Sequence, residues 1–583
     1  MVAAHFSSIE ACCKAVVPLM EHDLYTCEMM DKVILDCTRN NTTQAPNRFF
    51  IAGDPAAILM LELRDDAPEN LGKKHEALIE TLEKSGLSYA FPSLYGDDID
   101  KALELRKAGL GLLGNMVGDK KAVACIEDTA VALDDLAAYI GEFSALMKLY
   151  GQEAVYYAHA GAGELHLRPI LNLKKDSDVE LFRKITTDVA RLVKKYNGAL
   201  SGEHGDGIVR SEFIKMMIGD ENYRILQRIK TAFDPDNIFN PGKITDPFPM
   251  DASLRYTPGR SEPRIPTLLD FSDSMGILRA AEKCNGSGDC RKTHHARGAM
   301  CPSYHATKDE KDTTRARANA LREFLTHSGK KNRFDHTELK EVFELCLACK
   351  ACSSECPSNV DVAALKTEFL YQYRQANGTT LQDKAFAYTA RLNALSAVFP
   401  GLSNAFFSNS YTGRILKKLM GIAPERDLPR VARVNFDRFL NAQQTDPNSS
   451  EKVVLYIDEF TRYSDTGVGK DAIALLCRLG YRVELFYGES GRALISKGFL
   501  EQARKVADRN IEKLSAEISD TVPLVGIEPS ALLSFRDEYL RLATDKKAAA
   551  TVARHSFLIE EFLSGAMAKG HVRASQFTGA ART

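Results

Sequence analysis

The chain has 583 residues, more than one hydrophobic core usually organises, so its length suggests about three to four domains. Hydrophobic residues make up 44% of the chain and charged residues 26%, as in ordinary globular proteins. The net charge of −2 indicates neither nucleic acid nor a membrane surface as a partner. No apolar run approaches the ~20 residues that a membrane-spanning helix needs.

The N-terminal sequence and the cysteines bear on location. The N-terminus, MVAAHFSSIEACC, has neither the basic region nor the apolar run of a signal peptide. We therefore expect a cytoplasmic protein, with a peripheral position at the inner face of the membrane as the alternative. The 13 cysteines of a protein in a reducing compartment are not expected to form disulfides, and seven of them fall between Cys284 and Cys356.

Residues 1–247 alternate strand-like and helix-like segments, which predicts an α+β domain with a central sheet. AILMLELR at 57–64 has the apolar character of a buried strand, and 122–133 predicts another. Apolar residues then recur at helical spacing up to Gly151, where the glycine predicts a helix end. AVYYAHAGAGELHLRPIL predicts a strand, a glycine turn and a second strand, and residues 178–198 predict an amphipathic helix.

Three further regions follow along the chain. Residues 248–280 contain several prolines and few apolar anchors, which predicts a linker. Residues 281–440 predict a helical iron–sulfur domain that contains both groups of clustered cysteines. Residues 451–583 alternate as βαβαβ, which predicts a doubly wound α/β domain, and we expect its sheet to be incomplete.

The segment CLACKACSSECP at 346–357 has the spacing C-x2-C-x2-C-x3-C-P. Four thiolates at this spacing are typical of 4Fe-4S ferredoxins, in which the fourth cysteine of the motif ligates the other cluster of a pair. A zinc site and a redox-active C-x-x-C pair are the alternatives. Zinc sites seldom interleave three cysteines this tightly, so the motif predicts an iron–sulfur cluster.

An earlier group of cysteines comprises Cys284, Cys290 and Cys301, the last of which is followed by proline. The ligand exchange found in two-cluster ferredoxins predicts that one cluster is held by Cys301, Cys346, Cys349 and Cys352. A second cluster would be held by Cys284, Cys290 and Cys356, one cysteine short of four. It could be a three-iron type, take a further ligand from His294 or His295, or not exist.

HAGAGELH at 159–166 and GEHGDG at 202–207 supply histidines and an acidic residue beside glycine turns. A turn between two strands can bring His159 and His166 to one side, and Glu203 comes from another strand end. Two imidazoles and a carboxylate are a common ligand set for a divalent ion such as Zn²⁺ or Mn²⁺. Such an ion can bind a 2-hydroxy acid and lower the pKa of its hydroxyl, and His204 is suited to take the proton. The alternative is that these histidines are structural.

GEHGDG, HAGAGELHLRP, FDPDNIFNPGK and LELRKAGLGLL together resemble the C-terminal, substrate-side half of flavin-linked D-2-hydroxy acid dehydrogenases. The cysteine segments, followed by ESGRALISKG and GIEPSALLSFRDEY, resemble large bacterial enzymes that join such a flavoprotein to an iron–sulfur module. The resemblance extends in order over nearly the whole chain. It implies an α+β cap domain of the FAD-linked oxidase C-terminal type, a helical ferredoxin-like domain and a partial α/β domain.

The resemblance also implies cofactors and residue roles. FAD would accept a hydride, and the 4Fe-4S cluster would carry single electrons away. The implied metal ligands are His159, His166 and Glu203, the catalytic base is His204, and Arg106 binds the substrate carboxylate. The residues implied to lie at the flavin are Glu203, His204, Asn240 and Lys243. Judged without the resemblance, Arg106 fits a charge on a helix surface, and Asn240 fits a turn.

The substrate implied is D-2-hydroxyglutarate, with D-lactate as the alternative, and the electron acceptor is a quinone or another electron carrier. Three departures from the family affect these expectations. The chain begins in the cap region without a glycine-rich flavin domain, which implies a fragment, a misassigned start, or an electron-transfer subunit that needs a flavin-domain partner chain. Ile126 and Glu127 stand where some members place a basic residue for the distal substrate carboxylate, and Ala531 stands where related redox domains often place cysteine.

Overall fold

The computed structural model describes residues 1–39, 44–443 and 451–577. The chain divides into two compact units. The first contains residues 1–263 together with the short segments 282–289 and 353–360, and the second contains the rest. Among the described residues, no helix has both the length and the apolar character needed to cross a membrane.

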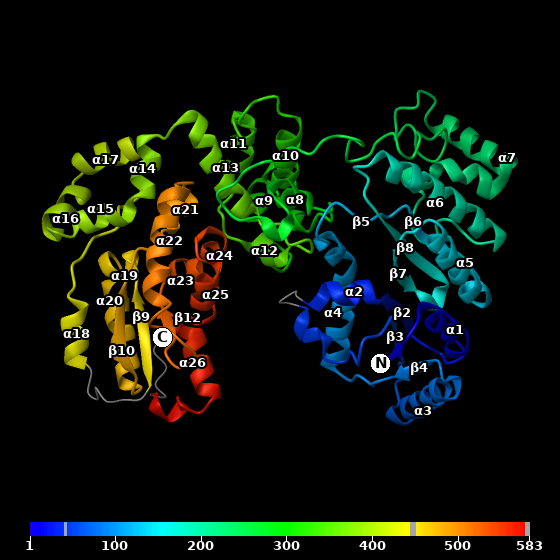
Figure 1. The fold of residues 1–583 in the computed structure, drawn as a ribbon, viewed down its shortest axis with the longest axis horizontal. Helices are drawn as coiled ribbons and strands as arrows, with labels where there is room; N and C mark the ends of the chain where they lie inside the picture. Colours follow the sequence, from blue (N-terminus) through cyan, green and yellow to red (C-terminus); the bar gives the residue numbers. More distant parts are fainter. Residues whose placement is uncertain (40–43, 444–450, 578–583) are drawn as a thin grey trace. The chain divides into compact units, whose positions relative to one another are not determined.

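The first unit is built on an eight-stranded sheet with the strand order β4-β1-β3-β2-β7-β8-β5, in which β6 also pairs with β8 (Figure 1). Neighbouring strands pair antiparallel. The strands are β1 (Val2–Phe6), β2 (Thr26–Asp31), β3 (Ala57–Glu62), β4 (Ser88–Ala90), β5 (Lys121–Ala122), β6 (Ile126–Ala130), β7 (Ala154–His159) and β8 (Glu164–Leu171).

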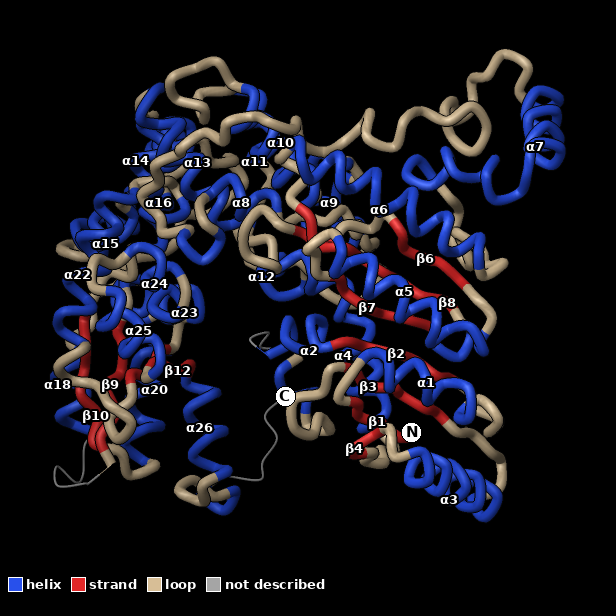
Figure 2. The backbone as a smooth tube through the Cα atoms, turned by 45° about the vertical axis from the view of Figure 1, so that its right-hand side comes forward, coloured by secondary structure: helices blue, strands red, loops and turns tan. Residues whose placement is uncertain are grey.

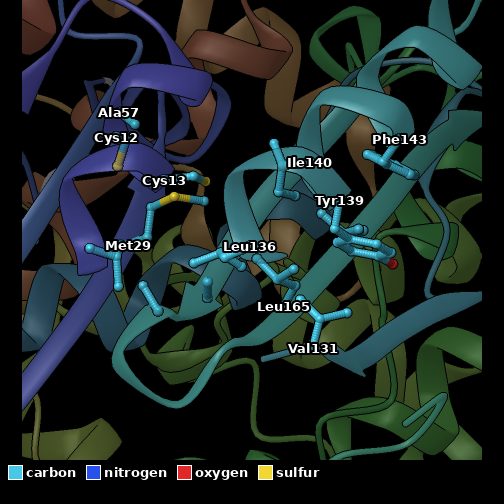
Figure 3. Close-up of a cluster of buried hydrophobic side chains, with 14 of the residues drawn as sticks. Cys12, Cys13, Met29, Ala57, Val131, Leu136, Tyr139, Ile140, Phe143 and Leu165 are labelled. Carbon is cyan, nitrogen blue, oxygen red and sulfur yellow. The ribbon is translucent and has the colours of Figure 1, made fainter. Parts of the chain in front are cut away.

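Both faces of this sheet are covered by helices, so alternate residues of its strands enter two different cores. Leu59 and Leu61 of β3 face the larger core, whereas Ile58 and Met60 face the smaller one. In the larger core, Cys12 and Cys13 pack among Met29, Leu136 and other apolar side chains (Figure 3). The helices that contribute to it include α1 (Ile9–Leu19), α3 (Pro68–Ser85), α5 (Leu136–Leu149) and α6 (Asp176–Lys195).

The smaller core lies under α2 (Lys32–Arg39) and α4 (Asp97–Leu112). Helix α7 (Gly207–Phe233) follows α6 along the chain and changes direction at Gly219, whose φ is +83°. The single strand predicted over 122–133 is instead divided into β5 and β6. Residue Asp128 in β6 has a φ of +75°, and the β6–β8 register shifts at this point, which marks a bulge.

The second unit begins with short helices around the cysteine motifs and continues through a helical stretch (Figure 2). These helices are α8 (Ile277–Glu282), α9 (Pro302–Thr307), α10 (Thr314–His327), α11 (Thr337–Glu344), α12 (Ala351–Glu355), α13 (Val362–Asn377), α14 (Leu381–Ala387), α15 (Thr389–Ser396), α16 (Pro400–Ser408), α17 (Thr412–Met420) and α18 (Phe436–Gln443). The unit boundary crosses α8 and α12.

The remainder of the second unit is a four-stranded parallel sheet with the order β10-β9-β11-β12. Its strands are β9 (Lys452–Ile457), β10 (Arg482–Tyr487), β11 (Leu524–Gly526) and β12 (Ser556–Leu558). The helices between and after them are α19 (Glu459–Tyr463), α20 (Thr466–Arg478), α21 (Arg492–Ser496), α22 (Leu500–Leu514), α23 (Pro529–Arg536), α24 (Glu538–Leu542), α25 (Lys546–Arg554) and α26 (Ile559–Ala568). The helical region and the α/β region, predicted as separate domains, thus share one compact unit.

Candidate functional site

The β7–β8 hairpin places two histidines and a glutamate on one face of the first unit's sheet. His159 pairs with Glu164 across the hairpin, and Tyr157 pairs with His166. Directly paired residues project to the same face, as do residues two apart in a strand, so all four side chains share a face. Leu165 and Leu167 point the other way, into the larger core. Glu164 is thereby brought to the site, although the sequence did not single it out.

The turn between these strands needs glycine. Gly163 has a φ of +69°, and a Cβ there would lie 2.2 Å from the carbonyl oxygen of Val131. Any other residue would therefore meet backbone that cannot move aside easily. The turn between β7 and β8 therefore packs directly against the backbone that follows β6.

Asp128 holds the turn that carries Glu203 and His204. Its carboxylate accepts hydrogen bonds from the amides of Glu203 (2.8 Å) and His204 (2.9 Å) and from the hydroxyl of Ser201 (2.6 Å). Its own carbonyl accepts the amide of Gly202 at 2.7 Å. Burial acts to raise the pKa of the Asp128 carboxyl, but these hydrogen bonds outweigh it and lower the pKa to about 2.

The three predicted metal ligands lie together with Glu164. One donor atom from each of His159, Glu164, His166 and Glu203 falls within 4.8 Å of the others. The Nε2 atoms of the two histidines lie 3.7 and 3.8 Å from Oε1 of Glu203, and His166 Nε2 lies 3.6 Å from Oε1 of Glu164. These separations exceed hydrogen-bond distance, but they are close to the roughly 3.4 Å between ligands that each lie about 2.1 Å from one tetrahedral ion.

The electrostatics of this group fit a divalent cation. Oε1 of Glu164 is buried without a hydrogen-bond partner, as is Nδ1 of His166. Burial, reinforced by neighbouring carboxylates, raises the pKa of Glu164 to about 8, and burial lowers the pKa of His166 to about 4. A neutral imidazole is the form that ligates metals, and a cation would favour the ionised carboxylate. The residues present therefore suit a divalent ion.

Glu28 of β2 connects this group to Arg106 of α4. The Glu28 carboxylate lies 3.0 Å from Nδ1 of His159 and forms an ion pair with the Arg106 guanidinium. The hydrogen bond to Glu28 raises the pKa of His159. A carboxylate on the far nitrogen of an imidazole is the usual way in which a metal-binding histidine is oriented. Arg106 also donates to the carbonyl of Ala158 at 3.3 Å and lies over the ring of Tyr157.

His204 lies at the solvent side of the group and is about half exposed. Its ring stacks against that of His166, with centroids 5.7 Å apart and an interplanar angle of 18°. Its Nε2 is 3.1 Å from Oε1 of Glu203. A base in this position can meet a substrate that arrives from solvent and reaches the ligand group.

A second arginine, missed by the sequence analysis, lies next to the site. Arg168 follows His166 by two residues on the same face of β8 and forms an ion pair with Glu127 of β6. The predicted flavin contacts Asn240 and Lys243 lie instead in the exposed segment after α7. Neither belongs to the group of mutually close ligand atoms.

In the second unit, four cysteines line one small cavity: Cys301, Cys346, Cys349 and Cys352. These are the four that the ligand-exchange rule assigned to one cluster. The fully buried Arg317 also lines the cavity and donates to Sγ of Cys301 at 3.4 Å. Four convergent sulfurs fit a cubane cluster, and the buried guanidinium would offset part of the negative charge of the thiolates.

The remaining clustered cysteines fall in both units. Cys284 and Cys356 belong to the segments of the first unit, whereas Cys290 belongs to the second. Within the first unit, the Cys356 segment packs on α4. A Cβ at Gly111 would lie 2.5 Å from Cβ of Pro357, and one at Gly114 would lie 2.5 Å from Oγ of Ser358. Cys284 and Cys290 are both buried.

Comparison with known families identifies two domains. Residues 1–244 match the C-terminal domain of FAD linked oxidases, and residues 283–361 match a 4Fe-4S dicluster domain that spans all seven clustered cysteines. These matches confirm the predicted FAD-linked oxidase and 4Fe-4S modules. A divalent metal is not part of either description.

Curated relatives are similar over longer stretches. A D-2-hydroxyglutarate dehydrogenase of Pseudomonas putida is 30% identical over 93% of this chain and 58% of its own length. One from Escherichia coli is 32% identical over 76% of this chain and 47% of its own length. A D-lactate dehydrogenase of Archaeoglobus fulgidus is 33% identical over 33% of this chain and 39% of its own length. The chain spans about half the length of the first curated relatives it matches.

Proposed function

We propose that this chain, which joins the C-terminal domain of FAD linked oxidases to a 4Fe-4S dicluster domain, is the substrate and electron-transfer part of a D-2-hydroxy acid dehydrogenase. The observation that carries the proposal is that one chain contains four mutually close donor side chains beside His204 and a cavity lined by four cysteines. D-2-hydroxyglutarate is the first substrate to test, because relatives bearing that name match most of the chain. D-lactate is the second.

The residues of the first unit divide the substrate chemistry among them. His159, Glu164, His166 and Glu203 would hold a divalent ion, Zn²⁺ or Mn²⁺, which would supply Lewis acidity toward the substrate hydroxyl. Glu28 orients His159 through its Nδ1. Asp128 keeps the Glu203–His204 turn in place through two backbone amides. His204 Nε2 takes the hydroxyl proton, and FAD supplies the acceptor for the hydride.

Two arginines serve the carboxylates of the substrate. Arg106 remains our proposal for the carboxylate beside the hydroxyl. The substrate would replace Oε2 of Glu28 on the guanidinium, while Oε1 of Glu28 stays on His159, because a guanidinium can exchange one carboxylate for another. Arg168 lies on the same face of β8 as His166, and we assign it to the distal carboxylate of a dicarboxylic substrate. Glu127, which pairs with Arg168, would be displaced in the same way.

The flavin-binding domain is proposed to pack on α7 and the segment that follows it. Apolar side chains are exposed along this surface: Ile225, Ile229, Phe233, Ile238, Phe239 and Phe248. An exposed apolar patch of this kind marks a surface that another domain covers. Asn240 and Lys243 lie within the same segment, as flavin contacts should. A longer form of this chain and a partner chain are the two sources of the covering domain, and both give the same contacts.

Electrons then leave through the clusters of the dicluster domain. One cluster is held by Cys301, Cys346, Cys349 and Cys352. A second cluster on Cys284, Cys290 and Cys356 stays a prediction from their spacing in the sequence, with a three-iron type or a further ligand from His294 or His295 as its alternatives. An electron-transfer subunit without its own substrate turnover is the second candidate function, favoured by the exposed apolar surface around α7.

One anaerobic preparation tests both functions. Iron, sulfide, zinc, manganese and flavin are measured on the same sample, and D-2-hydroxyglutarate or D-lactate is then added while the visible spectrum is recorded. Bound flavin that bleaches with either acid supports the dehydrogenase. Cluster absorption without flavin supports the subunit that needs a flavin-binding partner. Absence of iron and sulfide would contradict both.

A further inference from the structure

A large cavity in the second unit lies at the carboxyl edge of the parallel sheet. Its volume is about 890 Å³, within the range of small-molecule sites. Phe460 follows β9, Arg492 follows β10 and Ser530 follows β11, and all three line the cavity. β9 has β10 on one side and β11 on the other, so the cavity lies where the strand order reverses. That position is where open α/β sheets bind their ligands.

The same cavity touches the loop that holds the cluster. Three residues line both this cavity and the small cavity of the cysteines: Leu347, Ala348 and Lys350. They lie between the cysteines of the 346–352 segment. A molecule in the large cavity would therefore contact the cluster loop directly. No residue of the metal-ligand group in the first unit lines it.

The walls of the cavity are of two kinds. Phe386, Phe407, Leu416 and Met420, from α14, α16 and α17, form an apolar side. Figure 1 shows these helices at the end of the sheet where α19 and α21 begin. The opposite side is polar and charged: Lys350 forms ion pairs with Asp537 and Glu538, and Arg492 lies over the ring of Phe460. An occupant should thus have an apolar body and oxygens that accept hydrogen bonds.

The exposed surface of α15, α16 and α17 favours a lipid source for that molecule. Large apolar side chains that do not line the cavity are exposed along α15, α16, α17 and their connections: Leu395, Val398, Phe399, Leu402, Phe406, Tyr411, Ile415 and Leu419. Residues 388–433 also contain seven arginines and lysines but only two acidic residues. Apolar side chains combined with an excess of basic ones are typical of helices that lie in a membrane interface.

We propose that this cavity binds a lipid-soluble quinone, which takes electrons from the adjacent cluster while α15–α17 rest on the membrane surface. Two electrons pass one at a time from the cluster to the quinone, two protons come from water, and a quinol is released. Under the proposed function, oxidation of the hydroxy acid to the keto acid supplies the two electrons and releases the two protons. Binding and reduction of the quinone do not depend on that source.

The test starts from protein reduced chemically with a stoichiometric amount of dithionite, so hydroxy acid turnover is not needed. Decylubiquinone is then mixed in anaerobically, and the return of the oxidised cluster absorption is followed. Ala385→Trp and Ala493→Trp fill the cavity from two sides, and the exposed Ala516→Trp serves as the control. We expect at least a tenfold slower reoxidation in both cavity variants, an unchanged rate in the control, and unchanged reoxidation by ferricyanide in all proteins.

Equal quinone rates in the wild-type protein and both cavity variants, with cluster absorption intact, would overturn the proposal. Slower reoxidation by both quinone and ferricyanide would also overturn it, because that result means damage at the cluster.

A second experiment measures flotation with vesicles of anionic lipid. Flotation that is lost in the double variant Leu395→Ser and Leu402→Ser supports the membrane source, and failure of the native protein to float contradicts it. If reduced protein reduces quinone but no hydroxy acid reduces the protein, the proposed function fails and this inference stands.

Discussion

At the scale of single residues, His204 is the side chain on which the proposed chemistry most directly depends. Its side chain is the most exposed of the three site histidines, 48% against 33% for His159 and 4% for His166, and its Nε2 lies 3.1 Å from Oε1 of Glu203. We expect His204→Ala to lower hydroxy acid oxidation by about 10²- to 10⁴-fold, the usual contribution of a general base. The cluster absorption and the metal content should not change.

The measurement is steady-state turnover of the flavin-loaded protein, with the exposed His327→Ala as a matched control. Addition of imidazole should restore part of the activity of His204→Ala, because a small base can enter the space left by the ring. Turnover of the variant at the native rate would show that another group accepts the proton.

Asp128 offers a second prediction at this scale. Its folded-state pKa of about 2 lies below the ordinary value of 3.8, so the ionised carboxylate stabilises the fold above about pH 4. This contribution, about 2 kcal/mol for a shift of this size, is lost as the pH falls through 4 towards 2. Asp128→Asn should lower the urea midpoint of the first unit's unfolding at pH 7 and reduce its acid sensitivity.

Urea unfolding at pH 7, 4 and 2.5 separates the two effects. The difference between native protein and Asp128→Asn should narrow as the pH falls, because the native carboxylate becomes protonated. A difference that is constant with pH would show that the substitution acts through shape and not through charge. Ser201→Ala, which removes one donor to the same carboxylate, should give a smaller effect in the same direction.

At the scale of elements, α4 is the helix on which the Cys356 segment packs. Gly111→Ala places a Cβ 2.5 Å from Pro357, so we expect a loss of about 1–3 kcal/mol from overpacking. Gly72→Ala in α3 is the matched control, since a Cβ there meets nothing within 4 Å. That change should stabilise the protein by about 0.5–1 kcal/mol through helix propensity.

Chemical denaturation of both variants provides the measurement. Opposite signs for the two alanines would support the close packing of Pro357 against α4. If Gly111→Ala is as stable as Gly72→Ala, the 353–360 segment does not pack against this helix in solution.

Patterns within single elements were the part of this fold that could be predicted. The hairpin of β7 and β8, the glycine turn and the amphipathic α6 follow from local period and turn residues, so their positions agree with the sequence. Because the hairpin was predicted, the sequence also predicted that His159 and His166 lie on the same side. Glu164 could have been found as well, because it lies two residues before His166 in the same strand and must share its face.

The partners contributed by other strands could not be predicted in the same way. Glu28 lies 131 residues before His159, and Asp128 lies 75 residues before Glu203. Only the strand order of the sheet brings these pairs together, and local sequence does not encode that order. The bulge that directs the Asp128 carboxylate towards the 201–204 turn contains no glycine, so the sequence gives no local sign of it.

At the scale of the whole molecule, the proposed metal ligands and the cysteine cavity lie in different units of the chain. A substitution at Cys349 tests electron transfer without changing the proposed substrate site, because Cys349 lines the cysteine cavity of the second unit. Cys349→Ser removes one of four thiolates, so we expect loss of most of one cluster's iron and of the corresponding visible absorption. Cys37→Ser, in α2 of the first unit, should retain both.

The flavin provides the second measurement on the same variant. In Cys349→Ser loaded with FAD, a hydroxy acid should still bleach the flavin, since the first unit is unchanged, but transfer to an external quinone should fall by at least tenfold. Unchanged iron and sulfide would remove Cys349 from the ligand set. If flavin bleaching is lost along with the cluster absorption, the two units do not function independently. The cluster would then be needed for the substrate site to form.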